Sequence, residues 1–453
     1  MHRLFAALLL VCACAAAETH GAVAIRNAKI VTVGGPELSK GTVVIRNGLI
    51  EAVGENVQAP ADAAVVEGEG LTVYPGLVDG LSTWGMPGGA APATGGGRGA
   101  TAAAPAAPTA AAATARPARG PEDRPLTTSW VKAADEVQPG DRRIATARAA
   151  GFTTAVAFPT RGIFAGQGAI IDLISAEQPG EMVVAPAAGQ YISLTRSGGG
   201  FPAALMGTIA YIRQIYLDAA HYALVKEAYA RDPRGMQRPA YDRALEGVLE
   251  SKRILLPANR LVEIDRMLRF AAELKQPAIL YGMQEGFRPE AVDLLKKAGV
   301  PALVSLKWPE APRDLDPETV ESLRTLQTRD QAPSAPMMLK KAGVPFALYS
   351  DGLDQARDLQ RAVKKAIDAG LSREDAVRAL TLSPAEIYGV ADRLGSIEKG
   401  KIGNLVVTRG DIFDDRTKVE MIFVDGVKYT PPPETPPAGG RGAPAAETPG
   451  GIQ

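Results

Sequence analysis

Histidine and cysteine are scarce in this sequence. Its 453 residues include three histidines, His2, His20 and His221, and two cysteines, Cys12 and Cys14. Only His221 lies in the body of the chain, in a helical context that favours a packed or helix-surface side chain. The composition therefore excludes a Cys–His or Ser–His nucleophilic pair, and it excludes a disulfide framework as well.

Net charge and long apolar runs are also lacking. Lys and Arg together number 50, as do Asp and Glu, so the formal net charge is zero. This balance gives no electrostatic reason to expect a nucleic acid or an anionic membrane surface as a partner. Beyond the N-terminal segment, no stretch approaches the roughly 18 consecutive apolar residues of a membrane span, so no span is expected.

The N-terminal segment has the layout of a secretory signal peptide. Arg3 precedes the apolar run 4–11, and three alanines follow at 15–17. A basic start, a short apolar run and small residues at a cleavage site are typical of export signals. We predict a signal peptide over residues 1–17 and an exported protein, periplasmic or extracellular. A lipoprotein acylated at Cys14 is the alternative.

Two further segments are poor in large apolar residues. Residues 85–124 and 431–453 consist mainly of Gly, Ala, Pro and Thr. Such segments bury too little apolar surface to offset the entropy lost on ordering, so both are predicted to be disordered. The first would be an insertion, and the second a C-terminal tail.

Short β-branched runs dominate both ends of the remaining chain, residues 18–72 and 394–430. Asn47-Gly48 and Asp425-Gly426 each separate two such runs, and these dipeptides suit the positive φ angles of a two-residue hairpin turn. We predict a small β-sandwich domain that is built from both chain ends.

The central region, residues 73–393, alternates short apolar runs with longer amphipathic segments. Runs such as 253–256, 278–281, 302–306 and 346–349 are each followed or preceded by a helical pattern. This rhythm predicts a parallel sheet with crossover helices, and the number of units favours a TIM-like (β/α)8 barrel. The fold class is therefore α/β.

The stretch Val73 to Trp84 reads Val-Tyr-Pro-Gly-Leu-Val-Asp-Gly-Leu-Ser-Thr-Trp. It resembles the first barrel strand of the amidohydrolase superfamily, in which Pro-Gly and two apolar residues precede Asp-x-His-x-His. The stretch 379–407 is similar to the C-terminal signature of that superfamily, although Asn404 stands where relatives usually have aspartate. The loop 160–168 resembles that of secreted imidazolonepropionase-like amidohydrolases.

The resemblance implies a hydrolase of non-peptide or cyclic-amide carbon–nitrogen bonds that uses two divalent metal ions, zinc among them. Such ions would lower the pKa of a bound water and polarise the scissile carbonyl. In this sequence Leu81 and Thr83 occupy the positions of the two ligand histidines. We therefore expect no metal ligands and no cofactor.

The resemblance assigns Asp351, after the run 346–349, to the final-strand aspartate that takes the proton. Three polar residues follow earlier strands, Asn259, Arg260 and Gln284, and they are predicted to line a ligand site. Lys307 at another strand end is a candidate base or anion-binding group. The structural alternatives are an Asx turn at Asp351, loop hydrogen bonds at the amides and an ion pair at Lys307.

Three functional hypotheses stand side by side. In the first, the chain is a degenerate superfamily member that acts as a non-catalytic partner, as a homo-oligomer or in complex with an intact amidohydrolase. Alternatively, it is a mono-metal or metal-free hydrolase that uses Asp351, or a protein that binds a small-molecule ligand. Fold alone does not decide among them, because function resides in the site.

Overall fold

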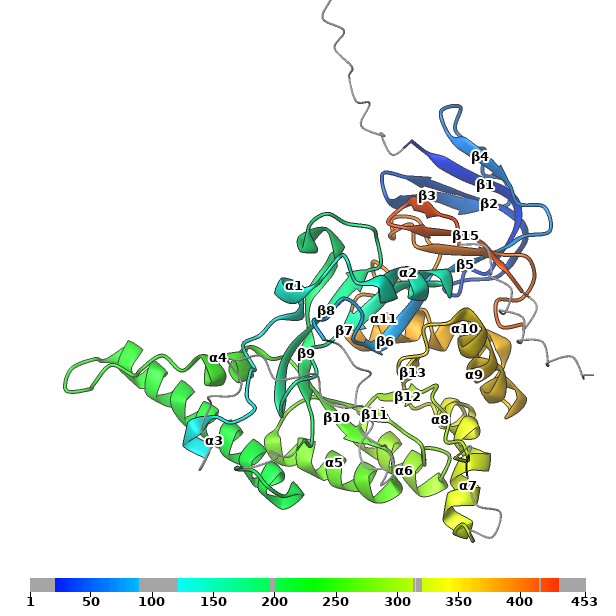
Figure 1. Cartoon of the computed structure of the whole chain (residues 1–453). Helices are drawn as coiled ribbons and strands as arrows, with labels where there is room; N and C mark the ends of the chain where they lie inside the picture. The colour runs from blue at the N-terminus through cyan, green and yellow to red at the C-terminus, as the bar shows by residue number, and fades with distance from the viewer. Residues whose placement is uncertain are drawn as a thin grey trace, which may run out of the picture.

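The computed structural model describes residues 21–88, 121–195, 200–312, 314, 320–414 and 417–431. The predicted signal peptide, with Cys12 and Cys14, lies outside these ranges, as does most of the predicted disordered segments. Figure 1 shows two bodies, a barrel with its surrounding helices and a smaller sheet that joins the two chain ends. The predicted α/β architecture is confirmed.

The smaller sheet has the strand order β16-β15-β14-β5-β1-β2-β3, and β4 pairs with β1. Its strands form one hydrogen-bonded sheet to which both chain ends contribute, as the predicted composite domain requires. The hairpin turns at Asn47-Gly48 and Asp425-Gly426 have positive φ at all four residues, as predicted. Gly403 links the two tips, because its N–H donates to the carbonyl of Gly48 and its carbonyl accepts from Gly426. The strands are β1 Val23–Ile30, β2 Leu38–Arg46, β3 Leu49–Gly54, β4 Ala64–Glu67, β5 Thr72–Pro75, β14 Leu405–Thr408, β15 Val419–Val424 and β16 Val427–Tyr429.

The barrel sheet runs in the order β13-β12-β11-β10-β9-β8-β7-β6. Its strands are β6 Leu77–Ser82, β7 Phe152–Ala157, β8 Phe164–Asp172, β9 Val183–Ile192, β10 Ile254–Ala258, β11 Ala278–Gly282, β12 Ala302–Ser305 and β13 Phe346–Tyr349. All neighbouring pairs are parallel except β7–β8 and β8–β9. The all-parallel order that the barrel prediction implied does not hold at β8, and residues 164–168, which were expected in a loop, form the first half of that strand. Only a short loop joins β7 to β8, and a short loop connects antiparallel strands but cannot cross over between parallel ones.

Helices cover the outside of the barrel sheet (Figure 1). The longest, α3, has 27 residues. The α-helices are α1 Ala133–Glu136, α2 Arg142–Ala149, α3 Leu205–Arg231, α4 Arg243–Glu250, α5 Leu261–Leu274, α6 Pro289–Ala298, α7 Leu323–Gln331, α8 Ala335–Ala342, α9 Ala356–Asp368, α10 Arg373–Ala379 and α11 Leu382–Tyr388. The part of the chain that the structure describes also contains the short 3-10 helices η1 Pro121–Asp123, η2 Pro179–Met182 and η3 Ala332–Ser334. No helix among the described residues is long and apolar enough to cross a membrane.

The predicted disorder of segment 85–124 does not include its two ends. Met86 is buried against the barrel core, at 3% exposure. Arg124 forms ion pairs with Asp218 of α3 and Asp242 at the start of α4. The composition of the segment, which is rich in small residues, gave no indication that Met86 and Arg124 anchor its ends. The rest of the segment, residues 89–120, lies outside the described residues.

Candidate functional site

The carboxyl ends of the parallel strands bring several of the predicted residues to one edge of the barrel. Asp351 follows β13, Lys307 follows β12, Gln284 follows β11 and Asn259 follows β10. Parallel strands that share a barrel place their carboxyl ends on one face, where barrel enzymes build their sites. The sequence-based assignment of these residues to strand ends agrees with the structure.

The interior of the barrel, however, is filled by large apolar and aromatic side chains. Leu81 is fully buried in a cluster with Phe158, Tyr191, Tyr281 and Tyr349. Tyr281 stacks on Tyr191 with 5.5 Å between ring centroids, and its hydroxyl donates to that of Tyr191 at 2.9 Å. We call Phe158, Tyr191, Tyr281 and Tyr349 the aromatic interior. It occupies the space around position 81, which is the first histidine position of the superfamily motif.

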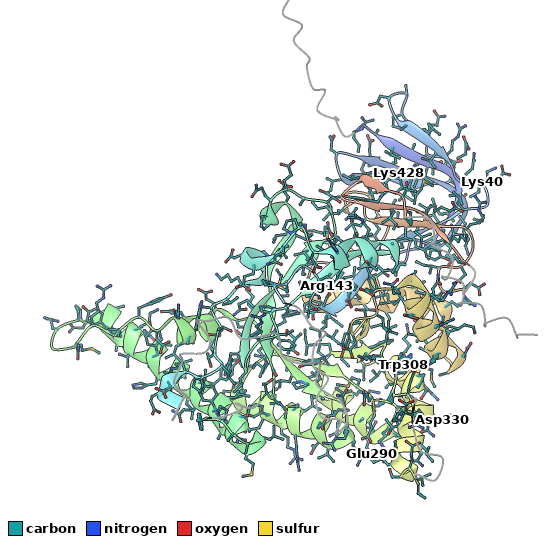
Figure 2. All side chains as sticks on the ribbon, viewed as in Figure 1. Lys40, Arg143, Glu290, Trp308, Asp330 and Lys428 are labelled. Carbon is teal, nitrogen blue, oxygen red and sulfur yellow. The ribbon has the colours of Figure 1, made fainter. Side chains whose placement is uncertain are left out.

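Thr83, at the second histidine position, is held by Arg143. The Arg143 guanidinium donates to the Thr83 hydroxyl at 3.1 Å and to the Thr83 carbonyl at 2.9 Å. It also forms an ion pair with Asp141, which caps the start of α2. Arg143 is labelled in Figure 2, next to the strand that leads to Thr83. The hydroxyl and the carbonyl of Thr83 are therefore both engaged by Arg143.

Asp79, in the motif strand β6, is fully buried and bonds to Ser350. The Ser350 N–H donates to Asp79 Oδ1 at 2.8 Å, and the Ser350 hydroxyl donates to Oδ2 at 2.6 Å. Burial raises the pKa of Asp79 to about 7, although both hydrogen bonds oppose this. Asp79 therefore joins the first and last barrel strands, a task that the sequence analysis did not assign to it.

Asp351 lies next to this pair, at 3% exposure. Its carboxylate accepts a hydrogen bond from the Ser305 hydroxyl at 2.7 Å, and its backbone has a φ of 51°. Burial raises the pKa of Asp351, while the Ser305 hydrogen bond and the charge of Lys307 oppose the increase. Lys307 itself is exposed, and it lies near enough for its charge to act on the Asp351 carboxylate. The structure thus brings both predicted catalytic candidates together.

The three predicted ligand-lining residues have different surroundings. Asn259 is buried, and its side-chain oxygen lies over Gly282, where an added Cβ would approach it to 2.2 Å. Gln284 is half-buried. Arg260 instead forms an ion pair with Glu263 one turn further along the chain and is 55% exposed. Its side chain stabilises the start of α5, so the structure provides no role for it in a shared pocket with Asp351.

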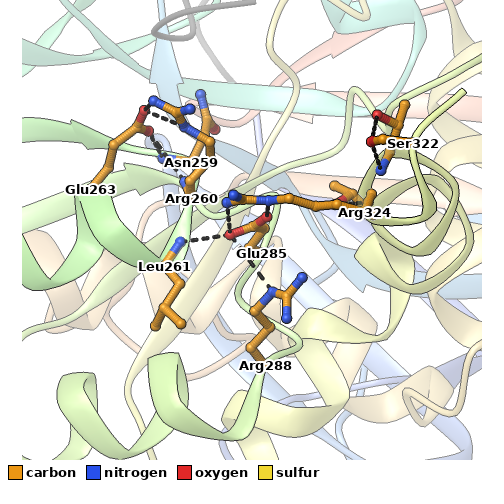
Figure 3. Close-up of polar contacts among 10 residues, drawn as sticks. Asn259, Arg260, Leu261, Glu263, Glu285, Arg288, Ser322 and Arg324 are labelled. Carbon is orange, nitrogen blue, oxygen red and sulfur yellow. Dashed lines mark hydrogen bonds and ion pairs between the residues drawn. The ribbon is translucent and has the colours of Figure 1, made fainter.

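Glu285 is the charged residue at these strand ends that sequence reasoning missed. It is 2% exposed, and the Arg324 guanidinium donates to both of its oxygens, at 2.7 and 2.9 Å. The N–H of Leu261, the first residue of α5, donates to it at 2.8 Å, and Arg288 lies 3.7 Å away (Figure 3). These contacts lower the pKa of Glu285 although burial opposes them. The sequence did give one indication of this position, because Glu285 directly follows Gln284, which was predicted to line the site.

We predict that Arg324→Met destabilises the fold by about 1–2 kcal/mol. The Glu285 carboxylate then stays buried, and only the Leu261 N–H and Arg288 remain to offset the cost of burying its charge. Arg260→Met is the matched control, since the exposures of the two arginine side chains are 52% and 55% but the partner of Arg260, Glu263, is 23% exposed. That variant should cost less than about 0.5 kcal/mol. Urea unfolding of both variants measures the difference, and equal losses would contradict a special role for Glu285.

The residues present do not fit a pair of metal ions. Zinc and similar ions bind imidazole, thiolate or carboxylate ligands, whereas Leu81 offers no donor atom and Thr83 is bound to Arg143. Among the residues that the structure describes, no three His, Cys, Asp or Glu side chains gather closely enough to hold an ion. Asp79 and Asp351 remain, but both already accept hydrogen bonds from serine hydroxyls.

A surface depression of about 490 Å³ lies near the start of α2. Its lining residues are Met86, Gly88, Gln138, Gly140, Asp141 and Arg143. None of them belongs to the carboxylate pair of Asp79 and Asp351. The depression therefore borders the Thr83 position through Arg143, but it does not include the two carboxylates.

The fold defines a class of protein, an α/β barrel with carboxylates at its strand ends, joined to a sheet made by both chain ends. Comparisons with known proteins agree with this class. The model of the Amidohydrolase family matches residues 261–428. The crystal structure of an amidohydrolase from Thermotoga maritima is 26% identical, with a TM-score of 0.70 over 90% of this chain and 100% of that one. Phenylurea hydrolase B has a TM-score of 0.53 at 17% identity, over 90% of this chain and 96% of that one, which supports the fold alone.

The imidazolonepropionase of Flavobacterium johnsoniae is 32% identical over 110 residues. That alignment covers 21% of this chain and 27% of the relative's length. The matched family model, this partial alignment and the shared fold all support the resemblance to the amidohydrolase superfamily. The predicted resemblance is confirmed.

Proposed function

We propose that this chain is a degenerate amidohydrolase that acts as a non-catalytic partner, either in a homo-oligomer or in complex with an intact superfamily member. The proposal rests on the residues that occupy the two motif histidine positions and on their contacts. Leu81 packs into the aromatic interior, and Thr83 is bound to the Arg143 guanidinium. Regaining a metal ligand at either position would require repacking a buried core, which is costly in close-packed interiors.

The chemistry of the remaining groups supports the same proposal. A hydrolytic superfamily site needs an activated water, and metal coordination is what lowers the pKa of water toward neutrality. The Asp351 carboxylate could accept a proton, but a carboxylate alone is a weak base toward ordinary water. A single general base contributes about 10²–10⁴-fold to a rate, which is small beside a complete metal site.

A residual hydrolase is the second candidate, and one observation favours it. Lys307 is exposed next to the buried Asp351, and its charge opposes the rise in the pKa of that carboxyl. A base and a cation side by side could act on a small polar substrate. The small-molecule binding hypothesis uses the same residues without a reaction step.

Amide turnover tests the proposal, with cyclic amides and aryl dipeptides as substrates. We expect no hydrolysis by the purified chain above the rate without protein, and any trace from contaminants should persist in Asp351→Asn. Asp354→Asn is the matched control, because Asp354 lies three residues away and its side chain interacts with the adjacent Gln355. Turnover that is lost in Asp351→Asn but kept in Asp354→Asn would establish the residual hydrolase instead.

A further inference from the structure

Helix α7 is an extra element in the connection between two barrel strands. The parallel strands β12 and β13 need a crossover between them, and α8, whose Ala335 and Leu339 are buried, supplies it. α7 precedes α8 in the same connection, and Figure 1 shows it below α8 at the edge of the molecule. Because this connection starts at the carboxyl end of β12, α7 belongs to the loops at the mouth of the barrel.

The packing of α7 against the rest of the molecule is slight. None of its nine residues, all of which the structure describes, is buried. Leu323 and Leu326 are 70% and 45% exposed, whereas α8, one residue shorter, buries three residues. A helix of fewer than about 12 residues is marginal in water and depends on tertiary packing. We therefore expect α7 to have low local stability.

The polar side-chain contacts of α7 are local, with one exception. Arg329 forms an ion pair with Glu321, which directly precedes the helix cap. Among the described residues, the ion pair of Arg324 with Glu285 is the polar side-chain contact that joins α7 to a residue outside 321–334. One ion pair therefore connects the helix to the strand ends.

This ion pair holds the start of α7 against the ends of β10 and β11. Figure 3 shows Arg324 extending to Glu285, where its guanidinium donates to both carboxylate oxygens. The N–H of Glu285 donates to the carbonyl of Asn259 at 2.7 Å, which places Glu285 between the two strand ends. At its other end α7 continues into η3, whose Ala332 and Pro333 are buried. The helix is thus fixed by packing at one end and by one ion pair at the other.

We propose that α7 is a lid on the mouth of the barrel, with η3 as its hinge and the ion pair of Arg324 with Glu285 as its latch. Arg324 is 52% exposed, so water can replace its contacts when the pair opens. Leu261 and Arg288 still bind the Glu285 carboxylate in that state. Opening would move α7 away from the strand ends that carry the predicted ligand-lining amides, as hinged elements over binding sites do. This inference does not depend on the proposed function, since a binding protein and a hydrolase could both use such a lid.

Hydrogen exchange, followed by mass spectrometry, compares α7 with α8 in the same chain. The two helices have nine and eight residues, so they are matched in length. A released helix of this size does not keep its own hydrogen bonds. We expect the hydrogen-bonded amides of α7 to exchange at least about 100-fold faster than those of α8. Equal protection of the two helices would overturn the proposal.

Spin-label distances test the latch. In a chain with Cys12 and Cys14 changed to serine, labels at Val262→Cys of α5 and Leu326→Cys of α7 report the position of the lid. These side chains are 48% and 45% exposed, so the labels do not disturb the core. We expect a shorter and a longer distance, and Arg324→Met should increase the longer population at least about threefold.

Arg329→Met is the matched control, because it removes an ion pair of the same helix that does not reach the strand ends. Its distances should equal those of the labelled chain without that change. Labels at Val262→Cys and at Lys341→Cys, in the last turn of α8, should give one narrow distance in every variant. A single α7 distance that Arg324→Met leaves unchanged, or an equal shift in both variants, would contradict the latch.

Discussion

Asn404→Asp should destabilise the chain by about 3–5 kcal/mol at pH 8. The side-chain N–H of Asn404 donates to Asp172 at 2.9 Å and to the Thr154 hydroxyl at 3.1 Å, and Asp172 is 4% exposed. Aspartate at 404 would replace this donor by a second carboxylate that faces the first in a buried setting. A second carboxylate at position 404 is therefore expected to be poorly tolerated in this chain.

The second-site change Asp172→Asn should restore most of the lost stability, because the donor and the acceptor then exchange places. Asn47→Asp is the control, since Asn47 is exposed in a hairpin turn that accepts aspartate. It should change the free energy of unfolding by less than about 0.5 kcal/mol. Urea unfolding of the variants measures these differences. A similar loss in Asn404→Asp and Asn47→Asp would refute the assigned role of Asp172.

Stability should also fall as the pH rises from 5 to 8. Burial raises the pKa of Asp172 to about 7, whereas an unfolded aspartate titrates near 3.9. Between these values the folded state holds a proton that the unfolded state has lost, so raising the pH favours unfolding. Burial also raises the pKa of Asp79 to about 7, and this shift lowers stability with rising pH in the same way. Each carboxyl contributes at most about 3 kcal/mol over this range.

Denaturant unfolding at several pH values checks this expectation. Asp172→Asn keeps the acceptor oxygen that both Thr154 and Asn404 use, so its fold should be preserved. Its stability should depend less on pH than that of the wild-type chain and should exceed it at pH 8. A wild-type profile that is flat, or that rises with pH, would mean that these carboxyls are ionised when buried.

Local patterns were sufficient to predict part of the fold, although β9 and the first half of β8 were missed. The Asn47-Gly48 and Asp425-Gly426 turns, the barrel strands from β10 to β13 and the strand-end position of Asp351 follow from short-range periodicity and turn chemistry. The antiparallel direction of β8 was missed, because residues 164–168 were taken as a loop, although a connection without a helix already excludes a parallel neighbour.

The candidate site was less predictable, because its contacts join distant residues. Asp79 bonds to Ser350 across 271 positions, and Asn404 bonds to Asp172 across 232. Periodicity contains no information on such pairs. The motif marked Thr83 as a changed position, but nothing near it in the sequence indicated that Arg143 would bind it.

Metal content is the most direct measurement of the central claim. The chain would be produced with zinc, manganese and iron supplied, purified without chelators, and analysed by elemental mass spectrometry. A barrel with Leu81 in its core and Thr83 bound to a guanidinium should retain far less than one ion per chain. One or two tightly held ions per chain, lost when Asp351 is replaced by asparagine, would contradict the account.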